Sequence, residues 1–102
     1  MIVRVLTARV RPESAGEFND LLRRQLPILK EHDGLIYVKL AHQVHRDREE
    51  VMLFEEWRDL AALYVWTGPD IGKPRLLPGA EELVEDLSVT HYEALDMDPP
   101  DG

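Results

Sequence analysis

The 102-residue sequence contains no cysteine. Disulfide bonds, thiolate nucleophiles and zinc sites built on cysteine are therefore excluded. Basic residues are also few, because 12 Lys and Arg stand against 20 Asp and Glu, which gives a formal net charge of −8. Nucleic acids and anionic membranes are bound by basic surfaces, so neither is an expected partner. The acidic residues are expected to lie on solvated helix faces.

Long hydrophobic runs are missing as well. No apolar segment approaches the roughly 20 residues that a membrane-spanning helix needs. The first ten residues, MIVRVLTARV, are too short and too charged for a signal peptide. These features predict one cytoplasmic domain with a modest core over residues 1–95. An acidic, flexible tail is expected over residues 96–102.

The middle of the chain is its most informative part. Apolar residues alternate over 35–44, which predicts a long strand, and a charged turn at 46–50 leads to a second strand over 51–57. Asp59 is a suitable N-cap for a short apolar helix that ends near Trp66. Ten strand residues span about 33 Å, which is more than one small domain can cover on both faces. The long strand therefore predicts a partner chain.

The first strand and the first helix are predicted from the N-terminal third. Residues 2–10 are rich in Val and predict a central strand. Ser14 and Glu17 have the spacing of a capping box, and apolar residues then recur at helical spacing. Pro27 lies inside this pattern and is expected to kink or split the helix. Gly34 is suited to a left-handed helix cap.

The C-terminal third completes the predicted topology. Residues 67–79 are rich in Gly and Pro, which predicts a long loop of the kind that often closes over a site. A short helix is expected over 80–86 and a last strand over 88–95. This order predicts a ferredoxin-like α+β fold, βαββαβ, with a four-stranded antiparallel sheet and both helices on one face. A second copy packed on the other, apolar face would make a homodimer.

Several short segments together resemble one known family. They are Val10-Arg11-Pro12-Glu13, Asp33-Gly34, Phe54-Glu55-Glu56-Trp57, Asp59 and Thr90-His91-Tyr92-Glu93. In this order and spacing, the chain resembles the antibiotic biosynthesis monooxygenase (ABM) family over about residues 1–95. The resemblance implies a dimeric α+β barrel with a pocket between helices and sheet. The family includes cofactor-free oxygenases of phenols or quinols, heme-degrading enzymes, and members with no known activity.

Trp66 is the leading candidate for a site residue. It follows Trp57 by nine residues, at the position where relatives place a pocket tryptophan, and an indole can stack on a flat substrate. Packing between helix and sheet is the alternative role. Heme-degrading relatives also need an asparagine where this chain has Thr7 and a histidine where it has Leu76. Because leucine cannot ligate iron, heme is not an expected cofactor.

Two histidines are candidates for a catalytic base. His42 falls among apolar residues of the predicted strand over 35–44, and partial burial would keep it neutral and able to accept a proton. The same argument applies to His91. A phenol or quinol must lose a proton before it can pass electrons to oxygen, so such a base would be useful. A hydrogen-bonded histidine in a dimer interface is the alternative for both.

The remaining candidates are expected to bind the substrate. Tyr37 and Tyr64 could point a hydroxyl into the pocket, or could serve packing alone. Thr7 and Arg4 belong to the first strand, and Arg4, or else Arg9, could pair with an anionic substrate or an oxyanion. Arginines at such positions can equally pair with acidic residues of the chain or of its partner.

Two functions are compatible with these patterns. The first is a cofactor-independent monooxygenase that oxidises a small aromatic phenol or quinol with O2, with His42 or His91 as base and Trp66 stacking on the substrate. The second is a non-enzymatic dimer that binds a small hydrophobic molecule. A metal site is not expected, because His42 and His45, three residues apart on a strand, point to opposite faces.

Overall fold

The computed structural model describes residues 1–43 and 49–95. The strands are β1 (Ile2–Val10), β2 (Leu35–His42), β3 (Glu49–Trp57) and β4 (Val84–Glu93), and the helices are α1 (Ala15–Lys30) and α2 (Leu60–Thr67). Short 3-10 turns, η1 (Pro12–Ser14) and η2 (Ala80–Leu83), precede α1 and β4. The predicted tail over 96–102 and residues 46–48 of the predicted turn lie outside the described residues.

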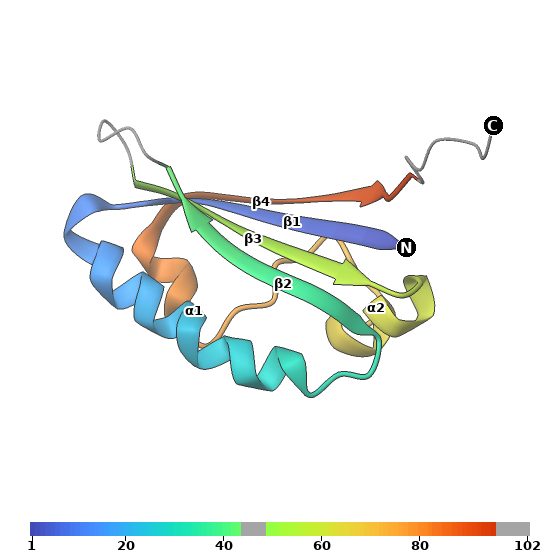
Figure 1. Cartoon of the computed structure of the whole chain (residues 1–102). Coiled ribbons are helices and arrows are strands. Elements are labelled where there is room, and N and C mark those ends of the chain that lie inside the picture. Colours follow the sequence, from blue (N-terminus) through green and yellow to red (C-terminus); the bar gives the residue numbers. More distant parts are fainter. Residues whose placement is uncertain (44–48, 96–102) are drawn as a thin grey trace.

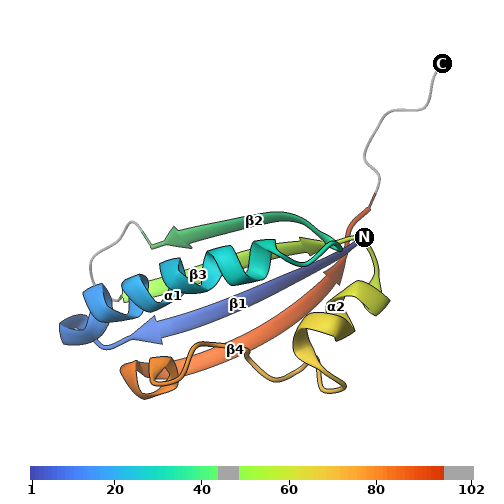
Figure 2. The same ribbon diagram turned by 90° about the horizontal axis from the view of Figure 1, so that it is seen from below.

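The strands form one four-stranded sheet in the order β2-β3-β1-β4, and each neighbouring pair is antiparallel. Both helices lie on the same face of this sheet (Figure 1). Viewed from the helix side, α1 runs along the strands while α2 lies near one end of the sheet (Figure 2). The predicted ferredoxin-like α+β fold is therefore confirmed, with β1 in the interior of the sheet as expected.

The main core lies between α1 and the sheet. Alternate residues of β1 face the helices, and Leu6, Ala8 and Val10 are each no more than 1% exposed. They form one buried cluster with Phe18 and Leu22 from the inner face of α1. Full burial of each large apolar side chain contributes about 1.5–3 kcal/mol. The amphipathic pattern of α1 thus fixes how this helix docks on the sheet.

A second buried cluster lies where α2 meets the sheet. It consists of Leu29, Trp57, Leu63 and Trp66. The chain enters β2 beside this cluster at Gly34, where an added Cβ would overlap the side chain of Ala62. Positive φ angles occur only at Gly68 and Gly79 among the described residues, so the predicted left-handed cap at Gly34 is wrong. Glycine is needed at this position because α2 approaches so closely.

The start and the end of α1 differ from the prediction in detail. The helix runs unbroken through Pro27. Because proline has no backbone N–H, the carbonyl of Arg23, one turn earlier, loses its helical hydrogen bond. Both residues are exposed, so water can bind this carbonyl instead. Ser14 is the N-cap residue, but its side chain makes no capping hydrogen bond. A 3-10 turn from Pro12 leads into the helix instead, so the predicted capping box with Glu17 is wrong.

Two strands also depart from their predicted form. β2 has a register shift between Leu35 and Tyr37, and Ile36 is 50% exposed and does not share the inner face with its neighbours. β4 begins at Val84, where the sequence predicts a helix over 80–86. Val84 pairs with Val10 at the end of β1, so this part of β1 has a strand partner in place of a helix.

The second face of the sheet is not covered by any helix of the described residues (Figure 1). It presents Val5 from β1, which pairs with Phe54 of β3, and the half-exposed Tyr37 and Tyr92 from the edge strands. Charged and hydroxyl side chains, among them Arg9, Lys39 and Glu56, share this face with the apolar ones, so it is less apolar than the sequence predicts. The predicted homodimer stays a prediction. None of the helices in the described part of the chain has the length and apolar character that crossing a bilayer requires.

Candidate functional site

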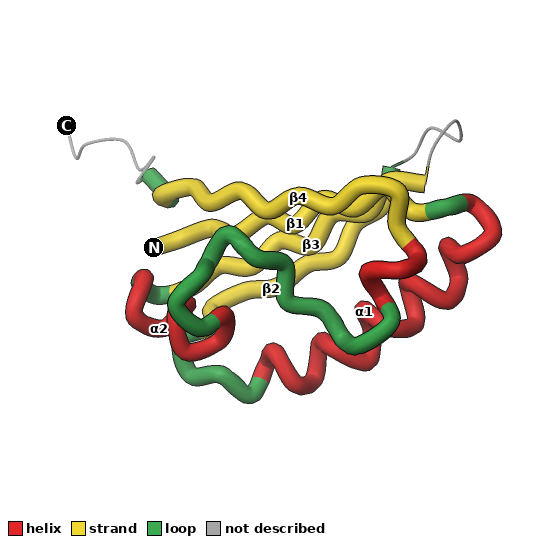
Figure 3. Tube along the Cα trace, turned by 180° about the vertical axis from the view of Figure 1, so that it is seen from behind, coloured by secondary structure: helices red, strands yellow, loops and turns green. Residues whose placement is uncertain are grey.

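The loop over 68–79 closes the space between the two helices. Figure 3 shows it passing under the sheet from α2 towards α1. Buried polar side chains hold it at both sides. Arg4 donates from Nη1 to the carbonyl of Ile71 (2.5 Å) and from Nη2 to the carbonyl of Lys73 (2.7 Å). From α1, the amide of Gln25 donates to the carbonyl of Arg75 (2.8 Å), and its oxygen accepts from the backbone N–H of Leu77 (3.2 Å).

Arg4 belongs to a buried polar cluster on the helix side of the sheet. Its Nε lies 3.8 Å from Oε1 of Glu55, and the two side chains are only 1% and 2% exposed. The indole N–H of Trp57 donates to the same Glu55 oxygen at 3.0 Å. Burial raises the pKa of Glu55 to about 7, against the smaller lowering effects of the Trp57 hydrogen bond and of Arg4. This carboxyl therefore changes its charge near neutral pH.

His91 completes this cluster from β4, which pairs with β1 at Arg4. Its Nε2 lies 2.9 Å from Nη1 of Arg4. A guanidinium can only donate, so Nε2 must accept, and the neutral ring then carries its proton on Nδ1. Burial, followed by the positive charge of Arg4, lowers the pKa of His91. To take up a proton at Nε2, His91 would first have to give up its bond with Arg4.

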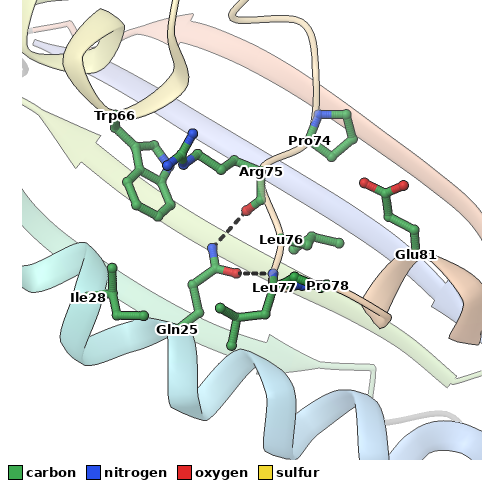
Figure 4. A pocket seen from close by; sticks show the side chains of 9 residues that line it. All are labelled: Gln25, Ile28, Trp66, Pro74, Arg75, Leu76, Leu77, Pro78 and Glu81. Atoms are coloured by element: carbon green, nitrogen blue, oxygen red, sulfur yellow. Dashed lines mark hydrogen bonds between the residues drawn. The ribbon is translucent and has the colours of Figure 1, made fainter.

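A cleft of about 460 Å³ lies between α1, α2 and the 68–79 loop. Its lining comprises Gln25 and Ile28 from α1, Trp66 from α2, residues 74–78 of the loop and Glu81 from η2 (Figure 4). This volume falls within the range of small-molecule sites in proteins. The cleft combines apolar walls with a few polar groups, an arrangement typical of a site for a small organic ligand.

Trp66 has an unusual set of neighbours. The guanidinium of Arg75 lies over its ring, 4.8 Å from the centroid. The ring of His32 stands nearly perpendicular to it at 5.1 Å, and also contacts Trp57 at 6.1 Å. Trp66 is 4% exposed, and its indole N–H has no hydrogen-bond partner among the described residues. An indole that is buried usually pairs its N–H, so Trp66 carries an unsatisfied donor where it borders the cleft.

The two predicted bases lie in different places. His42 is exposed at the far end of β2, where it borders a separate depression with Asn19 and Arg23 of α1. His91 lies in the buried cluster, and Arg4 links it to the loop that lines the cleft. The structure thus connects His91 to the loop through Arg4, places neither histidine in the lining of the Trp66 cleft, and leaves His42 at a separate depression.

The predicted substrate-binding residues are also dispersed. Arg4 is buried and fully engaged in the cluster already described. Thr7 alternates with the inward-facing residues of β1, and therefore faces the open side of the sheet. Tyr37 borders a shallow depression on that side with Phe54. Tyr64, on α2, is 44% exposed and does not line the Trp66 cleft.

Four residues of this region are not among the sequence-based candidates: Gln25, Glu55, Arg75 and Glu81. Gln25 occupies a position on the inner, otherwise apolar stripe of α1, and this signal is visible in the sequence. Arg75 and Glu81 come from the loop and from η2, where no periodicity indicates the direction of a side chain. No group of three or more His, Asp or Glu residues in the described ranges is arranged to hold a metal ion.

Comparison with solved structures identifies the same fold in many proteins. A Deinococcus radiodurans protein proposed to be an antibiotic biosynthesis monooxygenase shares 22% identity, with complete coverage of both chains and a TM-score of 0.76. A conserved protein from Methanosarcina mazei shares 22% identity, with 90% of this chain and 91% of that chain covered and a TM-score of 0.74. A Mycobacterium tuberculosis protein shares 22% identity over 93% and 95% of the two chains, with a TM-score of 0.75.

The family itself is shown by the sequence model that the chain matches. Residues 1–70 match the model of the antibiotic biosynthesis monooxygenase family. The match covers β1 to α2 and includes Trp66. This chain therefore belongs to the ABM family, as its motifs predict. No curated protein shows a significant match to it.

Proposed function

We propose that this protein is a cofactor-independent monooxygenase that oxidises a small aromatic phenol or quinol with molecular oxygen. The observation that carries this proposal is the cleft beside Trp66, whose volume suits a small aromatic molecule. The indole can stack on a flat ring, while the 68–79 loop limits the access of water. Membership of the ABM family supports monooxygenase activity in general.

The proposed reaction draws its electrons from the substrate. Loss of the phenolic proton gives an anion whose charge is shared with a ring carbon that bears hydrogen. This anion passes one electron to O2, and the two radicals combine into a carbon–peroxide bond. The peroxide takes up a proton, and the hydrogen on that carbon then leaves with the terminal oxygen as water. One oxygen atom stays as a carbonyl, so no external reductant or cofactor is required.

The geometry leaves two candidates for the group that accepts the phenolic proton. Glu81 is the carboxylate that lines the cleft, so it can reach a bound hydroxyl directly. His91 acts only if Arg4 moves away from its Nε2. A Glu81→Gln variant that loses most of its turnover, beside a His91→Asn variant that keeps it, would assign the base to Glu81. The opposite result would assign it to His91.

The homodimer is part of the proposal. Phe54, Tyr37 and Tyr92 belong to the face of the sheet that the described helices leave uncovered, and a second copy would bury them against their equivalents. A dimeric barrel of this kind keeps each cleft on the outer, helix side of its own sheet. A cytoplasmic location is proposed with it.

Oxygen uptake tests the enzymatic function. The purified protein is mixed with hydroquinones and anthrones, and dissolved O2 is followed with an electrode. Uptake above buffer, with the carbonyl product identified by mass spectrometry in 18O2, is the expected result. A Trp66→Ala variant should lose activity, while exposed Arg24→Gln on α1 serves as the matched control. Buffer-level uptake across the whole panel would remove the monooxygenase proposal.

A non-enzymatic ligand-binding dimer is the second candidate. It is favoured by one observation: Nε2 of His91 is already bonded to Arg4, His42 borders a separate depression, and no histidine of the described residues lines the cleft. A thermal-shift screen of aromatic compounds separates the two functions. A compound that stabilises the protein and is recovered unchanged under O2 supports this second function.

A further inference from the structure

Two hydrogen-bond donors lie side by side at one end of the cleft. The Trp66 indole N–H has no partner among the described residues, although its side chain is more than nine-tenths buried. The Arg75 guanidinium lies over the same ring, 4.8 Å from its centroid. Figure 4 shows the indole nitrogen on the side of the ring that faces this guanidinium. The pair thus offers a buried neutral donor beside an exposed cationic one.

The charges around this pair leave Arg75 without an acidic partner. The two ion pairs found in the described residues join Arg4 to Glu55 and Arg58 to Asp59, and neither involves Arg75. Gln25, the other polar group nearby, uses both ends of its amide on the backbone of the loop. Arg75 shares the lack of an ion pair with most of the described Lys and Arg residues, and is set apart from them by its position over the Trp66 ring at the cleft.

We propose that Arg75 and the indole N–H of Trp66 form an oxyanion subsite, which holds the ionised hydroxyl of a phenolic ligand. The proposal rests on the proposed function for the phenolic nature of the ligand, and adds which residues bind its charged oxygen. The planar guanidinium presents several N–H groups, and hydrogen bonds to an ionised acceptor are shorter and stronger than neutral ones. Arg4, the arginine that the sequence favours for this role, is engaged elsewhere.

The subsite makes a specific chemical prediction. Because it binds a phenolate more tightly than the corresponding phenol, the pKa of a bound phenol must fall. A tenfold preference for the anion corresponds to a lowering by one pKa unit.

The test uses 4-nitrophenol, which ionises near neutral pH and is yellow only as the anion. Its absorbance is titrated with pH in the presence and absence of the full-length protein, and 4-nitroanisole, which cannot ionise, serves as the ligand control. We expect the anion to bind about tenfold more tightly than 4-nitroanisole, and the pKa of the bound phenol to fall by about one unit. Neither measurement requires turnover or oxygen.

Variants then assign the effect to the two donors. Arg75→Gln should reduce the preference for the anion to twofold or less, whereas Arg75→Lys should retain part of it. Trp66→Phe keeps the stacking surface but removes the N–H, and should weaken binding of the anion about threefold to tenfold. Arg24→Gln, which removes an exposed charge from α1, should leave it unchanged. The side chain of Arg75 is exposed, so its replacement should lower stability by no more than the roughly 0.5–1 kcal/mol of its contact with the Trp66 ring.

The outcomes separate this proposal from the oxygenase proposal. Preference for the anion that depends on Arg75, together with no O2 uptake from any quinol, supports the subsite and removes the enzymatic function. Quinol oxidation with equal affinities for anion and anisole, or with an unchanged preference in Arg75→Gln, overturns the subsite and leaves the function standing. Failure of both probes to bind also overturns it.

Discussion

Replacement of Glu55 by glutamine should change how the stability of the fold depends on pH. The buried carboxyl has a pKa of about 7 in the folded chain, compared with its ordinary value of 4.5. Between these two values the unfolded chain has released the proton and the folded chain still holds it. The free energy of unfolding of the wild type must therefore fall as the pH rises from 4.5 to 7.

The size of this fall follows from the two pKa values. Their difference, about 7 minus 4.5, is about 2.5, and each pKa unit corresponds to about 1.36 kcal/mol, which gives about 3 kcal/mol. In Glu55→Gln this contribution disappears, because glutamine stays neutral and can still accept from Trp57. His91 acts in the opposite direction, since its pKa is lowered in the fold. His91 is present in both proteins, so its effect cancels when the free energies of unfolding of the wild type and Glu55→Gln are subtracted at each pH. The remaining pH dependence is that of Glu55.

Chemical denaturation at a series of pH values from 4.5 to 8 measures this difference. Glu56→Gln, which changes the next residue of β3 on the opposite face, is the matched control and should follow the wild type. As the pH rises from 4.5 to 8, the free energy of unfolding of Glu55→Gln should increase by about 3 kcal/mol relative to that of the wild type. Parallel curves for the wild type and Glu55→Gln would refute the assignment of a raised pKa to the buried carboxyl.

Three further predictions concern packing, the loop and assembly. Gly34→Ala should lower the free energy of unfolding, measured with urea, by about 1–3 kcal/mol, because its Cβ would overlap Ala62. In the control Gly16→Ala, inside α1, the new Cβ meets nothing within 4 Å, so the change should be neutral or stabilising by up to about 1 kcal/mol. Unchanged stability of Gly34→Ala would contradict the close approach of α2. Arg4→Met should lower stability by about 3 kcal/mol, since it leaves the buried carboxyl of Glu55 unpaired. It should also speed proteolysis of the 68–79 loop, which Arg4 holds through two hydrogen bonds. Cleavage at the wild-type rate would show that the loop does not depend on this side chain. Phe54→Glu, on the uncovered face of the sheet, should halve the mass measured by light scattering, and an unchanged mass would place the interface elsewhere.

Much of the fold could be predicted because its elements carry strong periodic signals. The Val-rich run of β1 predicts a central strand, and the helical spacing of Phe18, Leu22 and Leu29 in α1 points to one buried face. The start of β4 could not be predicted in the same way. Glu85 and Asp86 suggest a solvated helix, and only the pairing of Val84 with Val10 shows that a strand is required there.

Trp66, which lines the candidate cleft, is indicated in the sequence by a family resemblance, but the polar groups around it are not. Glu55 and Glu56 are adjacent acids in one strand, and the sequence does not say that burial will raise the pKa of one of them. Arg75 reaches Trp66 only because Gln25 and Arg4 hold the loop in place. Contacts between a loop and a distant side chain have no local pattern, so they become visible only in the folded chain.

The position of His32 has a practical consequence. Its imidazole stands between two indoles, those of Trp57 and Trp66, so its ring protons experience the magnetic ring currents of both. Any guest that enters next to one indole will disturb the local field at this imidazole. The chain therefore carries an intrinsic NMR probe of occupancy, which can be read without a label and without any chemical conversion of the guest.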